Sequence, residues 1–71
     1  MQRNVKVRLG SRIRVLRKHY GWTQAEFADY LGLDRSYIAE IELGKRNVCL
    51  VNLEVIAKGL GVTMSKLFYR I

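Results

Sequence analysis

The stretch "QAEFADYLGLDRSYIAEIELG", residues 24–44, contains two short helical patterns that meet at a single glycine. Gly32 can adopt a positive φ without a Cβ clash, so the chain can turn sharply there. Ala28 is small enough to let the two helices approach closely, while Ile38 and Ile41 anchor the second helix to a core. The outward face of that second helix is therefore expected to be centred on Ser36, Ala39, Glu40 and Leu43, so that the turn presents residues 35–40.

The residues before this stretch predict a first helix and a capped start to the second. A helical stripe consists of Leu9, Ile13, Leu16 and Tyr20. Gly21 ends this helix, and the following "TQAE" has the pattern of a capping box, in which Thr23 and Glu26 satisfy each other's backbone N–H groups. The initial "NVKVRL" is interpreted either as the beginning of the first helix or as a loose basic arm over residues 1–8.

Similar signals predict the remaining helices. Asp34 is a favourable N-cap for the third helix, which Gly44 closes. A fourth helix runs from about Leu50 to Gly61, and Thr63 can cap a short fifth helix. The chain shows no strand alternation of useful length, no internal repeat and no linker. We therefore predict one all-α domain over the whole chain, a compact bundle of five short helices.

Length and composition limit what this domain can be. A chain of 71 residues buries only about 60% of its unfolded surface, so association with a second copy would help its core. The 49% hydrophobic content is ordinary for a globular chain, and no apolar run reaches the roughly 18–20 residues of a membrane span. The single cysteine, Cys49, cannot form an internal disulfide. We expect a cytoplasmic protein that does not bind membranes.

The basic charge is large and unevenly distributed. The formal net charge is +7, and residues 1–20 hold seven basic side chains and no acid. Residues 21–43 hold five acids and one arginine, and residues 44–71 hold five basic side chains and one acid. Such a surplus is typical of proteins that bind nucleic acid, although a well-solvated surface would also explain it. The charge of the first helix is expected to act mainly through long-range attraction.

Two helices joined this tightly form a helix-turn-helix, in which the second helix enters the DNA major groove and the first lies across the backbone. The segments "TQAEFADYLGLDRSYIAEIELGKRN" and "LEVIAKGLGVTMSKLF" resemble the phage-repressor and Cro (XRE) family of DNA-binding proteins. The resemblance extends over about residues 9–68 and is closest to the controller proteins of restriction-modification operons. It implies a lambda-repressor-like homodimer on a roughly palindromic operator near a promoter, in a bacterial, phage or plasmid-borne setting. The chain departs from the family at Cys49, where serine is common.

Three side chains of the second motif helix are predicted to contact bases. Arg35 lies in its first turn and can pair with guanine O6 and N7, or instead with Asp34 or Glu40 on the protein surface. Ser36 can reach a base or a phosphate, and its alternative is a neutral surface hydroxyl. Glu40 can accept from cytosine N4, or it can penalise wrong sequences through its charge near the phosphates.

Contacts to the DNA backbone are predicted on both sides of that helix. Gln24 begins the first motif helix, where free N–H groups and the positive dipole end favour a phosphate; its alternative is a solvent-exposed amide. Tyr37 can donate its hydroxyl proton to a phosphate or can belong partly to the core. In the resembling proteins the loop after the second helix grips the backbone. This loop contains Lys45, Arg46 and Asn47, and ordinary loop polarity is the alternative.

Two further predictions concern the protein's own structure. Arg17 and Glu42 each lie roughly 40° from an apolar stripe, so they can pair between the first and third helices. The family resemblance also points to a structural bridge at these positions. A twofold dimer patch at the C-terminal end is expected to consist of Val62, Leu67, Phe68 and Ile71. Core packing is the alternative for Leu67 and Phe68.

No group of residues suggests a catalytic, cofactor or metal site. His19 and Cys49, the only residues of their types, fall on different predicted elements. The acids are scattered, and no glycine-rich phosphate loop is present. We therefore expect no enzyme, no cofactor and no small-molecule ligand, but double-stranded DNA and a second copy of the chain as partners. The main alternative is a protein-binding module: either an antitoxin-like regulator whose principal partner is a toxin protein, or a helical adaptor that does not bind DNA.

Overall fold

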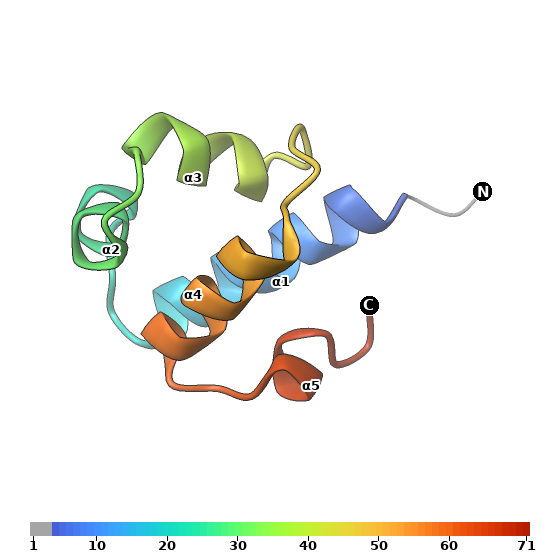
Figure 1. Ribbon diagram of the computed structural model, residues 1–71. Coiled ribbons are helices and arrows are strands. Elements are labelled where there is room, and N and C mark those ends of the chain that lie inside the picture. Colours follow the sequence, from blue (N-terminus) through green and yellow to red (C-terminus); the bar gives the residue numbers. More distant parts are fainter. Residues whose placement is uncertain (1–3) are drawn as a thin grey trace.

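The computed structural model describes residues 4–71 and shows, within that range, five α-helices and no strand. The helices are α1 (Val5–His19), α2 (Gln24–Leu31), α3 (Arg35–Glu42), α4 (Leu50–Leu60) and α5 (Met64–Leu67). α3 packs on α1 and α2, while α4 packs on α2 and α5. In Figure 1, α3 lies along the upper edge of the molecule, with α2 near its first residues. The predicted all-α fold is confirmed, and no helix of the described part is long and apolar enough to cross a membrane.

Side-chain caps stabilise three of the predicted helix starts, those of α2, α3 and α5. At α2, the Thr23 hydroxyl accepts from the Glu26 N–H at 3.1 Å, and the Glu26 carboxylate accepts from the Thr23 N–H at 3.0 Å, which completes the capping box. The pKa of Glu26 lies below its usual value because two interactions with Thr23 favour the charged carboxylate. The larger is the hydrogen bond from the Thr23 backbone, and the smaller involves the Thr23 hydroxyl. Asp34 caps α3 and Thr63 caps α5 through their side chains.

The basic N-terminal segment is helical. The Asn4 side chain accepts from the Val7 N–H at 3.1 Å, and α1 begins at Val5. Residues 5–8 are thus the first turn of α1, so the alternative of a loose arm is wrong for them. Residues 1–3, which complete the proposed arm, lie outside the described residues.

Two glycines allow α3 to lie close to its neighbours. Gly32 ends α2 with a φ of 72°, the left-handed conformation predicted for the turn. Gly10 lies on the face of α1 that meets α3, where a Cβ would collide with the carbonyl oxygens of Ile41 and Glu42. The backbones of α1 and α3 can therefore pack directly together. Nothing in the local sequence marks Gly10 for this role, because its contacts lie far along the chain.

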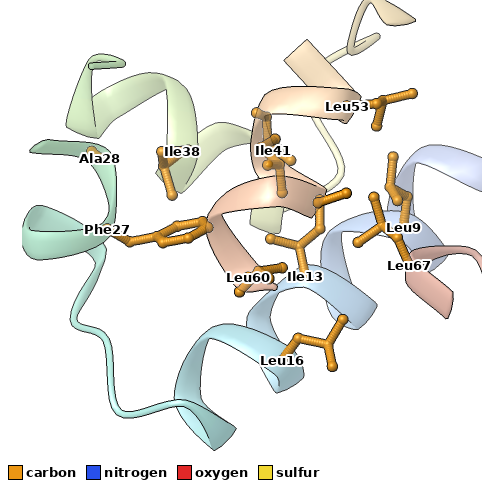
Figure 2. Packing of buried hydrophobic residues seen from close by; sticks show 12 residues of the cluster. Leu9, Ile13, Leu16, Phe27, Ala28, Ile38, Ile41, Leu53, Leu60 and Leu67 are labelled. Carbon is orange, nitrogen blue, oxygen red and sulfur yellow. The ribbon is translucent and has the colours of Figure 1, made fainter. Parts of the chain in front are cut away.

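All five helices contribute to one hydrophobic core (Figure 2). Its buried members are Leu9, Ile13, Leu16, Phe27, Ala28, Ile38, Ile41, Leu53, Ile56, Ala57, Leu60 and Leu67. α3 directs its two isoleucines into this core, as predicted. Tyr20 is 45% exposed, so its assignment to the buried stripe is wrong. The reason is that α1 ends at His19, and the Tyr20 ring packs edge-on against the His19 ring instead of reaching the core.

Candidate nucleic-acid interface

α3 presents the outward face predicted for it. Arg35 and Ser36 are exposed in its first turn, while Ile38 and Ile41 are buried on the opposite side. The helix begins at Arg35, so its free N–H groups and positive dipole end lie at the same surface. Arg35 and Ser36, which are predicted to contact bases, therefore lie on the side of α3 that faces away from the core.

Ser36 and Arg35 differ in their contacts. The Asp34 carboxylate accepts from both the N–H and the hydroxyl of Ser36, each at 3.1 Å. The Ser36 hydroxyl thus donates its proton within the N-cap and keeps only its acceptor capacity. Neither of the two ion pairs within residues 4–71 includes Arg35, so the alternative of a surface pair with Asp34 or Glu40 is not formed.

Glu40 and Arg46, predicted to contact a base and the DNA backbone, are joined to each other. Arg46 Nε donates to Glu40 Oε1 at 2.8 Å, and the two side chains are about half exposed. The Arg46 guanidinium also lies over the Tyr37 ring, 5.0 Å from its centre. The Tyr37 hydroxyl in turn accepts from Asn52 Nδ2 at 2.9 Å. These side chains form one series of contacts from α3 through the following loop to α4.

Two more predicted backbone contacts lie in the loop between α3 and α4, and a third, Tyr37, lies on α3. Lys45 and Asn47 are exposed on either side of Arg46, and Lys45 belongs to neither ion pair of residues 4–71. Tyr37 is half-buried, and because its hydroxyl accepts a hydrogen bond, its proton remains available to a phosphate. Both readings of Tyr37, as part of the protein's packing and as a donor to DNA, are therefore compatible with its position.

Arg17, Glu42 and Gln24 form a buried network between three helices. Arg17 Nε and Nη2 donate to the two Glu42 oxygens at 2.6 and 3.0 Å, and the side chains are only 6% and 2% exposed. Arg17 Nη1 donates to the Trp22 carbonyl at 2.7 Å, and Gln24 Nε2 donates to Glu42 Oε1 at 3.0 Å. The Gln24 side chain is thus partly buried, and one of its two amide N–H groups donates to Glu42. A phosphate contact at Gln24 would use the second amide N–H or the free backbone N–H groups at the start of α2.

An open hollow where three helices meet is lined with cations. Arg14 and Lys18 border it from the end of α1, Arg35 from the start of α3, and Gln24 from the start of α2. Guanidinium and ammonium groups beside a helix N-terminus suit a phosphate. Long-range attraction is the role expected of the α1 charges, yet three of them line this hollow. One is Arg17, which is paired with Glu42, and the other two, Arg14 and Lys18, belong to neither ion pair of residues 4–71. Their i, i+4 spacing, which places both on one face just before the Gly21 turn, is the signal in the sequence for this site.

Of the four side chains predicted to form a dimer patch, one belongs to the core and three are partly buried against it. Leu67 is fully buried, so its assignment to an interface is wrong; α5 turns this side chain inward against the core. The partly buried members, which pack against the core, are Val62, Phe68 and Ile71. Leu50 and Val51, at the start of α4, are instead 73% and 69% exposed. They line a shallow hollow together with Glu54 and Met64.

Cys49 is exposed at the N-cap of α4 and makes no side-chain hydrogen bond to the helix. Its thiol therefore does not replace the cap that a serine would supply. Among residues 4–71, no group of three His, Cys, Asp or Glu side chains is arranged to hold a metal ion.

The sequence profile of a helix-turn-helix family matches residues 13–67 of the chain. The control protein C.MunI of a Mycoplasma species is 50% identical over 66 residues, which cover 92% of this chain and 89% of the relative. The crystal structure of the restriction-modification controller protein C.AhdI from Aeromonas hydrophila matches with a TM-score of 0.84 at 44% identity, over 87% of this chain and 94% of that one. The controller protein C.Esp1396I, solved as a tetramer with its natural 35-base-pair operator, matches with a TM-score of 0.84 at 34% identity, over 94% and 88%. The similarity extends over nearly the whole chain.

Proposed function

This chain belongs to the helix-turn-helix family, and from that premise we propose that it is a transcriptional regulator that binds operator DNA sequence-specifically as a homodimer. The observation that best supports this is the outward face of α3, where Arg35 projects without an acidic partner beside the hollow lined by Arg14 and Lys18. α3 would lie in the major groove with Arg35 pairing with a guanine. The hollow would receive a phosphate of the adjacent backbone.

Relatives support operator binding and self-association. C.Esp1396I was crystallised as a tetramer with its operator, and C.MunI and C.AhdI carry the names of control or controller proteins. We extend this role to the present chain, with its own operon or a restriction-modification system as the regulated target. The family consists of transcriptional regulators, and the proposal assigns the chain no enzymatic activity. The proposed target is a roughly palindromic operator in bacterial, phage or plasmid DNA, so the protein would act in the cytoplasm.

The homodimer is proposed to form through the apolar side chains at the starts of α4 and α5. Leu50, Val51 and Met64 line one hollow, and the first two are the most exposed large apolar side chains of the described part. Leu50 and Val51 begin the helix that follows the loop after α3. A domain of this size also gains stability by covering such a surface. Val62, Phe68 and Ile71, being partly buried, have less free area to contribute.

Footprinting on the DNA upstream of the protein's own gene tests the proposed function. We expect two protected half-sites whose centres lie about 10 base pairs apart, or a multiple of that distance. The protection should persist in an excess of unrelated duplex. Equal binding to the upstream region and to unrelated DNA at every salt concentration would overturn the proposal and favour a protein-binding adaptor.

A further inference from the structure

Glu40 and Arg46 hold each other across the surface that the proposed function assigns to DNA. Glu40 lies on α3 and Arg46 in the loop after it, and their side chains pair at 2.8 Å. While they are paired, the carboxylate neutralises the guanidinium, so Arg46 adds no net positive charge to this surface. A neutralised arginine releases few counterions from a phosphate backbone and therefore contributes little to binding.

Tyr37 and Asn52 provide a second, uncharged support for Arg46. The guanidinium lies 5.0 Å from the centre of the Tyr37 ring, and Asn52 holds that ring through a hydrogen bond of 2.9 Å to its hydroxyl. This support does not depend on Glu40. Arg46 can therefore leave the carboxylate and keep its place beside the groove-facing helix.

A phosphate can displace Glu40 from Arg46, but the displaced carboxylate then needs a new partner. Half-exposed ion pairs are weak, so the pair itself opens readily. The freed Glu40 lies near the phosphates of the groove, where like charges repel it. In the major groove, the groups that can donate to it are the amino groups of cytosine N4 and adenine N6. Opening is thus favourable only where such a base is in reach.

We infer, on the basis of the proposed function, that the Glu40–Arg46 pair is a specificity gate. On unrelated DNA the gate stays closed and Arg46 remains neutralised. On the operator, a base amino group donates to Glu40, and Arg46 passes to a phosphate while it remains on the Tyr37 ring. Glu40 therefore acts in two ways, by reading a base and by suppressing non-specific binding.

The gate is tested by comparing Glu40→Gln with Asp29→Asn. Both changes remove one negative charge, but Asp29 is exposed on α2 and belongs to neither ion pair of residues 4–71. Affinity for operator and scrambled duplexes is measured at several salt concentrations. We expect Glu40→Gln to bind the scrambled duplex about two- to fivefold more tightly than Asp29→Asn does. Its slope of log K against log salt should be about 0.9 steeper, because Arg46 now meets a phosphate. The preference for the operator should fall.

The same comparison in an Arg46→Ala background separates the gate from simple charge repulsion. In the Arg46→Ala background, Glu40→Gln should raise the affinity for the scrambled duplex by little more than Asp29→Asn does. An undiminished gain in this background, or equal gains from the two changes in the unmodified chain, would overturn the gate. Thermal unfolding followed by circular dichroism checks that every variant is folded. If the unmodified chain bound operator and scrambled duplexes equally, the proposed function itself would be wrong. If it preferred the operator but the two substitutions raised the affinity for scrambled duplex equally, only the gate would be wrong.

Discussion

The guanidinium of Arg35 projects from the first turn of α3 and the ammonium of Lys45 from the loop after it, and neither has an ion-pair partner within residues 4–71. Each change to alanine removes one positive charge, so a difference between the two variants does not come from net charge. We expect Arg35→Ala to weaken operator binding by about 1–3 kcal/mol, to affect scrambled duplex much less, and to relax preference at one base. Lys45→Ala should weaken both duplexes similarly and reduce the salt slope by about 0.9. Competition binding with singly substituted operators measures both effects. If both variants lost the same affinity for operator and for scrambled duplex, the first turn of α3 would not contact bases.

At the scale of the helices, the Arg17–Glu42 pair joins α1 to α3, and Gln24 adds α2 to the same network. Arg17→Met should lower the free energy of unfolding by about 3–5 kcal/mol, because it leaves the Glu42 carboxylate buried without its cation. Adding Glu42→Leu should recover much of that loss, since two apolar side chains can replace a buried pair. Urea unfolding of the single and double variants gives the coupling between the two positions. A double variant as unstable as the sum of the two single changes would mean that the pair does not act as a unit.

At the scale of the whole molecule, the proposed dimer contact should respond to a charge placed in it. Leu50→Asp should convert the protein to a monomer in sedimentation experiments and weaken operator binding, because each half-site then binds one domain alone. Val15→Asp is the matched control, since Val15 on α1 is also a 60% exposed apolar side chain but lies outside the hollow. A dimer that survives Leu50→Asp would exclude the start of α4 from the interface. Dissociation by Val15→Asp alone would place the contact on α1.

The helices and the motif follow from the sequence because the interactions that define them are local. Thr23 and Glu26 cap α2 across three residues, and Asp34 caps α3 across two. Gly32 supplies its positive φ from its own backbone. Apolar spacing then shows which side of α3 is buried, and hence that Arg35 lies on the open side. These features depend on residues within about one helical turn, so they can be read before the packing is known.

The tertiary structure decided which partner each side chain meets. Helical spacing predicted that Arg17 and Glu42 could face each other, but it gave no sign that Gln24 would complete their network. It also placed Glu40 on an open face without showing that the loop after α3 folds back and brings Arg46 against it. The periodicity of a helix determines which residues share a face. What covers that face depends on how the helices pack, and those contacts join residues far apart in the chain.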